Sequence, residues 1–278
     1  MKTYLIQLLS KLELSLLRAG LPGRMFMSVA RSIAHRRLQR FSIDNEGDFV
    51  NSQSDGVIVS LEPYGTDLRK VYSRITDYWL VNYKLRPGDT VLDVGAGVGD
   101  DAWVFAKYVG PNGRVFSFEA NPKTARCLVK TVRRSGLENV QAFAVAVTDR
   151  SGRVMITDDM ADHQNSLIIK EGHLAVEVPA ITLDDFVESN GIDHIDMLKM
   201  NIEGAEKPAL LGFRHEFGRV RNVAIACHDW IADLGYSDSY RTREFISQFL
   251  ESEGFTVHRR TTDNRPWIRD TLLASRRV

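Results

Sequence analysis

Three glycines at alternate positions, Gly95, Gly97 and Gly99, follow a short apolar segment and precede a second apolar segment with helical spacing. A strand, a glycine-rich turn and a helix together present backbone N–H groups and a helix N-terminus to a ligand that lies across the turn. The spacing G-x-G-x-G differs from the dinucleotide pattern G-x-G-x-x-G, whose third position is here Asp100. A carboxylate at that position repels a pyrophosphate, so the turn indicates a ligand without phosphates.

Two carboxylates extend this candidate site. Asp93 lies inside the strand before the turn and can accept a hydrogen bond from a cationic or amino group. Glu119 ends the next apolar strand, where a carboxylate can bind the two hydroxyls of a ribose. These features fit S-adenosylmethionine, a sulfonium amino acid attached to a nucleoside. Two alternatives remain open here: Glu119 as a solvated surface acid, and a nicotinamide-dependent oxidoreductase.

Four motifs resemble those of known methyltransferases. The glycine turn and the segment after the second strand are similar to class I S-adenosylmethionine-dependent methyltransferases, and two later motifs resemble the FkbM family of O-methyltransferases. The resemblance covers roughly residues 88 to 230, about half of the chain. It implies methyl transfer to a hydroxyl of a sugar, polyketide or other small-molecule or glycan-linked acceptor. The motifs are Val91–Gly99, Phe118–Pro122, Thr182–Asp185 and Ile195–Glu206.

In open α/β sheets the ligand lies at the carboxyl ends of the strands, so we assign the cofactor site to residues at these ends. They are Asp93, Gly95, Gly97, Gly99, Glu119, Ala120, Asn121, Ala146 and Asn201.

The candidate catalytic residues follow two later strands. We predict His228 to be the general base, because a neutral imidazole with its ordinary pKa of about 6.5 can accept a hydroxyl proton. Glu203 is expected to orient His228 or Lys199, and Asn201 to position the cofactor or the acceptor. The alternative for His228 is a structural hydrogen-bonding role.

The sequence departs from the resembled family at two positions. Related sequences usually carry an aspartate where Asn201 stands and an acid where Ala226 stands. Hard cations require several anionic oxygens, so we expect no metal site. The same departures keep open a catalytically weak or inactive cofactor-binding or interaction protein. The family also places residues bordering the cofactor in the loop that here holds His163–Ser166, for which an ordinary surface loop is the alternative.

Strand and helix patterns alternate from Val91 onward and end in two strands, near 255–259 and 271–275. This predicts an α/β fold with a Rossmann-like, seven-stranded, mostly parallel sheet, helices on both faces and a C-terminal antiparallel hairpin. We assign residues 1–86 to an N-terminal helical extension and lid, and residues 87–278 to a class I methyltransferase domain.

The N-terminal extension has helical patterns in its first forty residues, with a second helix expected near 25–38. A short polar region, a strand near 57–61 and a helix near 68–84 follow. Tyr64 and Tyr72 are candidates for lining a lid over the site, with ordinary packing as the alternative.

Charge and cysteine content limit the partners. Lys+Arg and Asp+Glu are both 36, which argues against nucleic acid, although the first forty residues hold eight basic residues and one acid. Basic amphipathic helices of this kind suit peripheral contact with the inner face of a membrane, a homodimer, or packing on the domain. The chain lacks the run of about 20 apolar residues that a spanning helix needs. The two widely separated cysteines favour structural thiols and a cytoplasmic location.

Overall fold

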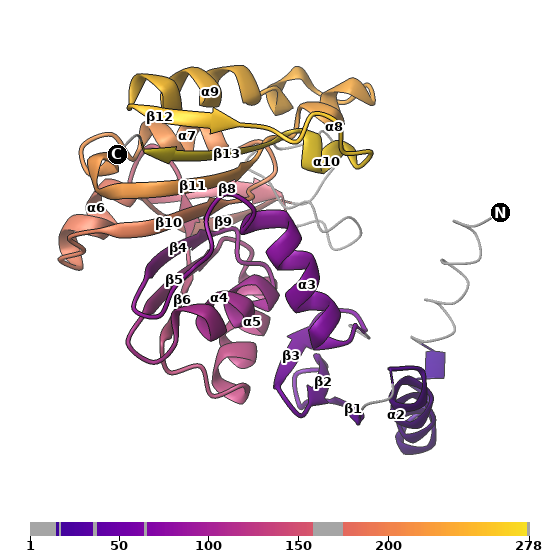
Figure 1. Cartoon of the computed structure of the whole chain (residues 1–278). Coiled ribbons are helices and arrows are strands. Elements are labelled where there is room, and N and C mark those ends of the chain that lie inside the picture. Colours follow the sequence, from indigo (N-terminus) through magenta and orange to yellow (C-terminus); the bar gives the residue numbers. More distant parts are fainter. Residues whose placement is uncertain (1–14, 17, 36–37, 64–65, 158–174, 277–278) are drawn as a thin grey trace.

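The computed structural model describes residues 15–16, 18–35, 38–63, 66–157 and 175–276 (Figure 1). The predictions for most of the first helix, for Tyr64 and for His163–Ser166 lie outside the described residues.

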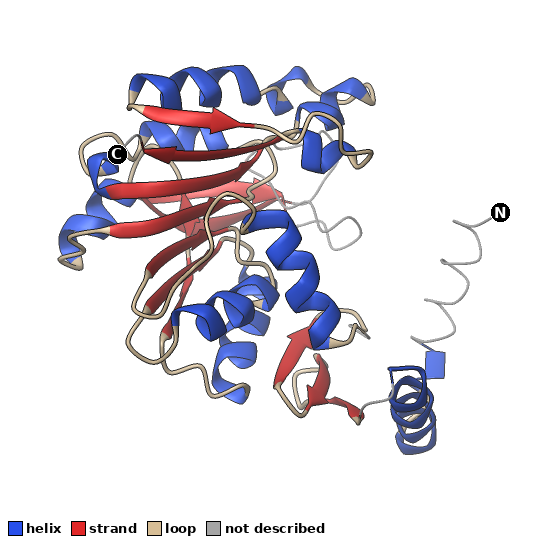
Figure 2. Ribbon diagram, in the orientation of Figure 1, coloured by secondary structure: helices blue, strands red, loops and turns tan. Residues whose placement is uncertain are grey.

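A seven-stranded sheet in the order β12-β13-β11-β10-β4-β5-β6 forms the centre of the molecule (Figure 2). Its neighbours pair in parallel, except that β13 is antiparallel to both β11 and β12. The predicted fold class, including the C-terminal hairpin, is therefore confirmed. The strands are β4 (Thr90–Val94), β5 (Arg114–Glu119), β6 (Val140–Ala144), β10 (Ile195–Met200), β11 (Val220–Ala226), β12 (Phe255–His258) and β13 (Thr271–Arg276).

Helices cover both faces of this sheet, and each face has its own apolar core. One core packs α6, α7 and α9 against the sheet, and the other packs α3, α4 and α5. Successive side chains of a strand point to opposite faces, so every central strand must be apolar on both sides. The helices are α3 (Leu68–Trp79), α4 (Asp100–Val109), α5 (Pro122–Arg134), α6 (Leu183–Ser189), α7 (Glu206–Leu211), α8 (Asp229–Asp233), α9 (Arg243–Ser252) and α10 (Pro266–Arg269).

The strand order changes direction at β4. The chain passes from β4 to β5 on one side and later returns to place β10 on the other side of β4. Ligands of open α/β sheets bind in the crevice at the carboxyl ends beside such a switch point. The glycine turn leaves β4 at that end, which is where the predicted site residues of β10 and β11 also lie.

A small parallel and antiparallel sheet, β7-β9-β8, lies after β6. It consists of β7 (Ala146–Val147), β8 (Gly152–Thr157) and β9 (Ala175–Ile181), in which β9 pairs in parallel with β7 and antiparallel with β8.

The N-terminal region contains more strand than the sequence indicated. The region that was expected to be short and polar forms two strands, β1 (Gln39–Ile43) and β2 (Phe49–Gln53). They form an antiparallel sheet with β3 (Gly56–Ser60), which is the predicted strand. The first two strands are short and half polar, so their periodicity is weak. Their stability comes from contacts with helices far away in the sequence.

Strand β3 is held against α5 by side-chain hydroxyls. The N–H of Val59 donates to Thr131 Oγ1 at 2.9 Å, and the N–H of Val57 donates to Ser135 Oγ at 2.8 Å. An edge strand otherwise leaves these donors without protein partners. The hydroxyls therefore join the small sheet to the main domain.

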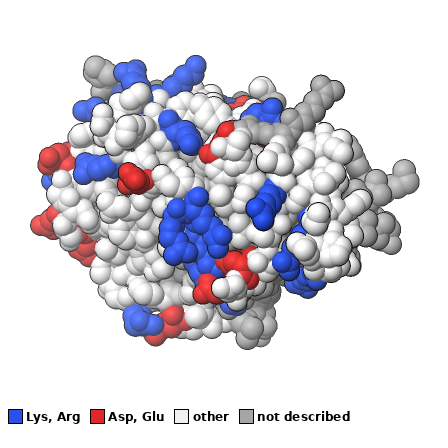
Figure 3. Space-filling view, turned by 90° about the horizontal axis from the view of Figure 1, so that it is seen from below, with Lys and Arg blue, Asp and Glu red and all other residues white. Residues whose placement is uncertain are grey.

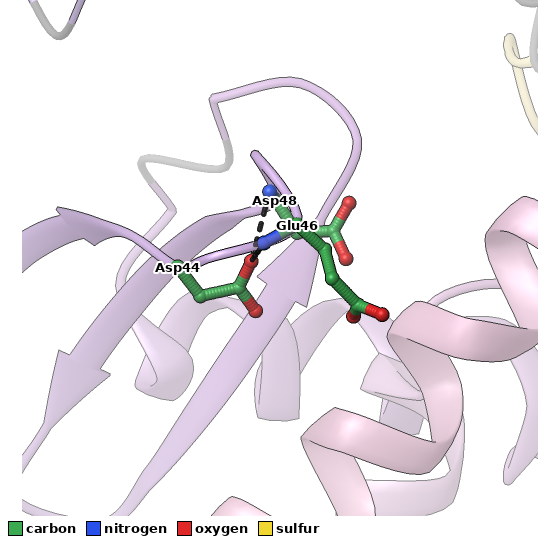
Figure 4. A group of neighbouring side chains, drawn as sticks. All are labelled: Asp44, Glu46 and Asp48. Carbon is green, nitrogen blue, oxygen red and sulfur yellow. Dashed lines mark hydrogen bonds between the residues drawn. The ribbon is translucent and has the colours of Figure 1, made fainter.

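Three carboxylates, those of Asp44, Glu46 and Asp48, lie together in the turn between β1 and β2 (Figure 4). All three contact one lysine of helix α5. The Nζ atom of Lys130 lies 2.7 Å from Asp44 and 2.6 Å from Asp48, and it also contacts Glu46. Arg126 adds two hydrogen bonds to Asp48, at 2.6 and 2.9 Å. In the part of the chain that is described, this trio is the group of carboxylates spaced for a metal ion, and the Lys130 ammonium already binds all three. On the lower face of the molecule, which Figure 3 shows, basic and acidic side chains accordingly lie side by side.

Removing Asp48 should destabilise the protein. Asp48 is the most buried of the three carboxylates that bind Lys130 and is also the partner of Arg126, so Asp48→Ala should lower the free energy of unfolding by about 1.5–3 kcal/mol. Glu46→Ala is the matched control, because that side chain is 56% exposed and should cost less than about 1 kcal/mol. Urea denaturation measures both. An equal decrease in the free energy of unfolding for the two variants would contradict the proposed contribution of the buried Asp48–Lys130 pair to stability.

The first described helix, α2 (Leu21–His35), begins directly after Gly20 and agrees with the second predicted helix. Among the helices in the described ranges, none combines the length and apolarity needed to cross a membrane.

Candidate active site at the carboxyl ends of β4, β10 and β11

The glycine turn after β4 has a left-handed backbone at each glycine. Gly95, Gly97 and Gly99 have φ angles of +77°, +55° and +92°. A Cβ atom on Gly95 would lie 2.0 Å from the carbonyl oxygen of Asn201, and one on Gly99 would lie 2.8 Å from Leu128. Nothing lies within 4 Å of a Cβ built on Gly97. The outer glycines therefore permit close packing, while Gly97 leaves open space for a ligand.

A buried ammonium group fixes the underside of this turn. Lys199 Nζ, on β10, lies 3.0 Å from Asp93 and 3.0 Å from Asp101, and it donates to the carbonyl oxygen of Gly95 at 2.7 Å. The ammonium also lies 5.3 Å from the centre of the Trp79 ring. Burial acts to lower the pKa of Lys199, but the two carboxylates outweigh it and raise the pKa above its ordinary value.

These contacts correct two sequence-based roles. Asp93 does accept from a cation, but that cation is Lys199 of the same chain rather than a group on the ligand. Lys199 was predicted to belong to the catalytic group, but it is fully buried, and the two carboxylates raise its pKa and favour the charged ammonium. Both residues position the glycine turn.

Glu119 lies at the end of β5 with its carboxyl group on the open side of the turn. Its two oxygens accept the N–H groups of Gly97 at 3.0 Å and Asn121 at 2.9 Å. Burial raises the pKa of Glu119 to about 7, although both backbone hydrogen bonds act in the opposite direction. A carboxylate has about four lone-pair sites, so these bonds leave capacity for a diol.

Asn121, Ala120 and Ala146, which were also predicted to bind the cofactor, lie in different surroundings. The Asn121 side chain accepts the N–H groups of Lys123 and Thr124, which corrects its role to that of the N-cap of α5. Ala146 is buried in β7, in the same apolar cluster as Ala120. Both alanines thus lie beyond the end of β5, close to Glu119.

Asn201 joins the two halves of the site. Its N–H donates to the carbonyl oxygen of Val94 at 3.0 Å, and its own carbonyl oxygen lies against Gly95. The residue is half-buried. It therefore links the end of β10 to the glycine turn.

His228 follows β11 and lies between two glutamates. Its Nδ1 atom is 3.0 Å from Glu206, and its Nε2 atom is 3.4 Å from Glu203. Burial acts to lower the pKa of His228, but the carboxylates of Glu206 and Glu203 outweigh it and raise the pKa to about 10. The arrangement favours the charged imidazolium over the neutral imidazole that the sequence predicts.

The two glutamates differ in exposure and backbone geometry. Glu206 is fully buried and also accepts the N–H groups of Ile202 and Gly204, at 3.2 and 3.3 Å. The Glu203 side chain is 20% exposed, and its φ of +53° is left-handed, which is uncommon for a residue other than glycine. Strained backbone of this kind is concentrated at functional sites. Glu206 is the first residue of α7, so its charge lies at the helix N-terminus as well as beside His228.

Two tyrosines near the charged groups were missed by sequence reasoning. Tyr78, at the end of α3, hydrogen-bonds Thr271, and its pKa is raised mainly by burial. Tyr240 is 1% exposed, and its hydroxyl has no hydrogen-bond partner within the described residues. Its pKa is raised by burial first and by Glu203 next. No sequence pattern in the loop 229–240 indicates that Tyr240 belongs to the site. For Tyr78, the aromatic residues at the end of the helix predicted near 68–84 were a signal that could have been used. Tyr72, by contrast, is a packing residue: its ring stacks on that of Tyr108, with 5.1 Å between the ring centres.

The model of the methyltransferase FkbM domain matches residues 93–257, more than half of the chain. This span runs from inside β4 to β12 and contains the glycine turn, both glutamates and His228. The chain belongs to the FkbM methyltransferase family. Family membership identifies the ligand of the glycine turn as S-adenosylmethionine and not a nicotinamide cofactor, because FkbM-family methyltransferases use S-adenosylmethionine.

Three sequence relatives of this FkbM-family chain are themselves methyltransferases. The 2-O-methyltransferase NoeI of Sinorhizobium fredii is 25% identical, over 61% of this chain and 77% of NoeI. The 31-O-demethyl-FK506 methyltransferase FkbM of Streptomyces tacrolimicus is 28% identical, over 63% of this chain and 75% of the relative. The hexuronic acid methyltransferase AglP of Haloferax volcanii is 24% identical, over 63% of this chain and 72% of AglP.

The FkbM-family site fits S-adenosylmethionine on structural grounds. The open space at Gly97 lies beside a carboxyl group that retains hydrogen-bonding capacity, and Asp100 starts the helix where a phosphate-binding site requires a glycine or alanine. Gly97 and Glu119 are the residues that would hold the nucleoside. The cofactor supplies an electrophilic methyl group.

Cofactor affinity should depend on pH through Glu119. Because burial raises its pKa to about 7, the ionised form that accepts a diol is lost as the pH falls through 7. The dissociation constant of S-adenosylhomocysteine should rise about tenfold between pH 8 and pH 6. Calorimetry measures this, and Glu119→Gln should bind weakly with no such pH dependence. Constant wild-type affinity over this range would remove Glu119 from the ribose site.

Removing the buried ammonium should damage the fold as well as the site. Lys199→Met leaves Asp93 and Asp101 close together without their cation, and should lower the free energy of unfolding by about 3–5 kcal/mol. Lys107→Met on the exposed side of α4 is the matched control and should cost less than about 1 kcal/mol. Denaturant unfolding curves that coincide for the two variants would contradict the positioning role.

Proposed function

We propose that this S-adenosylmethionine-dependent methyltransferase modifies a hydroxyl group of a sugar, polyketide or other small-molecule or glycan-linked acceptor. The observation that carries the proposal is the array of Glu203, His228 and Glu206 beside the glycine turn. The printed names of NoeI and FkbM specify O-methyl transfer, and that of AglP specifies a hexuronic acid. These names support a hydroxyl acceptor, with a sugar as the first class to test.

Methyl transfer to a hydroxyl requires two things from the protein. The acceptor oxygen must be aligned with the methyl carbon for an in-line displacement, and its proton must be taken up. The carboxylates of Glu206 and Glu203 raise the pKa of His228 and favour its charged form, so we assign the role of proton acceptor to another member of the array. Glu203 is the partly exposed member of the array, and we assign the proton to its carboxylate.

The remaining members of the array act through Glu203. Glu206 is buried and holds the Nδ1 side of His228, which turns the Nε2 side toward Glu203. The imidazolium then orients the Glu203 carboxylate. Asn201, at the junction of β10 and the glycine turn, is assigned to positioning the acceptor or the cofactor. The two departures from the family pattern, Asn201 and Ala226, leave this array intact.

The direct test combines binding and turnover. Purified protein should bind S-adenosylhomocysteine by calorimetry and transfer labelled methyl groups to hydroxyl acceptors, with hexuronic acid glycosides tested first. Glu203→Gln should lower kcat by about 10²–10⁴-fold, the usual contribution of general base catalysis, with little change in cofactor affinity. Glu46→Gln, in the distant β1–β2 turn, is the matched control and should retain wild-type turnover.

Other outcomes are equally informative. Failure to bind either form of the cofactor would overturn the whole proposal. Equal turnover by wild type and Glu203→Gln would remove the assigned proton acceptor. Turnover that appears only in Asn201→Asp would favour the alternative, a cofactor-binding protein that has lost catalysis, because that change restores the aspartate of the family pattern.

A further inference from the structure

Helix α2 is attached to the protein by its polar side. The N–H of Phe41 donates to Ser28 Oγ at 3.0 Å, and the N–H of Gln39 donates to Ser32 Oγ at 2.8 Å. Met27, on the same side, is buried with Phe41 in a small apolar cluster. These contacts with the edge strand β1 set the rotation of α2 about its axis.

The opposite side of α2 is apolar and exposed. A surface helix of a globular protein normally turns its apolar stripe toward the core, and α2 does the reverse. Contiguous exposed apolar patches of a few hundred Å² mark interaction sites. Figure 1 shows α2 at the edge of the molecule beside β1, away from the seven-stranded sheet. The exposed fractions are 70% for Leu21, 60% for Met25, 60% for Phe26, 58% for Val29 and 72% for Ile33.

The charges around this face are basic. Helix α2 contains no acidic residue, and its Arg24 and Arg31 are half-buried on the side of the helix that faces β1, not on the apolar face. Arg18 and Arg40, on either side of it in the sequence, are exposed. Over the first forty residues the chain has eight basic residues and Glu13 as its single acid. An apolar face with basic surroundings is complementary to a surface of anionic lipids.

A second copy of the chain fits this face less well. A helix of 15 residues is about 22 Å long and presents a face about 10 Å wide, whereas a stable dimer buries roughly 800 Å² on each partner. The small area of this face therefore favours a lipid surface over self-association.

We propose that α2 binds peripherally to membranes containing anionic lipids, with its apolar face inserted at the level of the headgroups. The serine contacts with β1 hold the helix in the orientation that this requires. The catalytic domain is thereby anchored at the membrane surface without a spanning segment.

The test is flotation of the full-length protein with vesicles. Wild-type protein should bind vesicles of equal parts phosphatidylglycerol and phosphatidylcholine, and binding should weaken as salt is raised from about 0.1 M to 0.5 M. Binding to vesicles of phosphatidylcholine alone should be weaker. Changing Met25, Val29 and Ile33 together to serine should reduce binding about tenfold or more. Val129→Ser is the matched control, because Val129 is also exposed on a helix, at 46%, but lies on α5.

Several results would overturn the proposal. Wild-type protein that does not float with anionic vesicles, or a triple variant that floats as well as wild type, would do so. Equal binding to neutral vesicles would remove the role of charge. A stable dimer in light scattering that the triple variant converts to monomers, without vesicle binding, would assign the face to a second copy of the chain. Superposable thermal unfolding curves of variant and wild type show that lost binding is not lost folding.

Discussion

The Lys199 ammonium, enclosed by Asp93, Asp101 and the Gly95 carbonyl, is the interaction on which the site depends. A buried ion pair is costly unless its geometry satisfies most of the charge, and here one cation meets two carboxylates and a carbonyl dipole. The contact joins the ends of β4 and β10 to the start of α4. It therefore holds the left-handed glycine turn in one shape before any ligand arrives, which is the preorganisation that cofactor binding requires.

A second charged array repeats this arrangement one strand farther along the sheet. His228 lies between Glu203 and Glu206 as Lys199 lies between Asp93 and Asp101. The first array is almost entirely buried, with the Asp101 side chain 12% exposed. The second includes Glu203, which is 20% exposed and has a left-handed backbone, and it is the array to which we assign the proposed chemistry. Although positions 201 and 226 lack acids, Glu206 supplies a carboxylate to His228 from α7.

The N-terminal sheet depends on interactions that cross large distances in the sequence. Thr131 and Ser135 bind the β3 edge, and the ammonium of Lys130 gathers the acids of the β1–β2 turn. All three come from one helix, α5. At the other edge, α2 offers serines to β1 and leaves its apolar side outward. The small sheet thus connects the catalytic domain to the proposed membrane contact.

Local patterns in the sequence determined the type and order of the main-sheet elements and the position of the glycine turn. They sufficed because apolar periodicity, glycine spacing and strand-end acids are short-range features, as Gly95 to Gly99 and Glu119 show. Only the tertiary structure decided which charges meet. Asp93 looked like a ligand residue until Lys199, more than 100 positions later, was seen beside it, and His228 looked neutral until two glutamates were seen around it. Strands β1 and β2 were missed because they are short and half polar, and the partners of the acids in their turn lie on α5, at least 78 positions later. A pKa, and the face that a helix turns outward, are set by neighbours in space, and those neighbours exist only once the chain has folded.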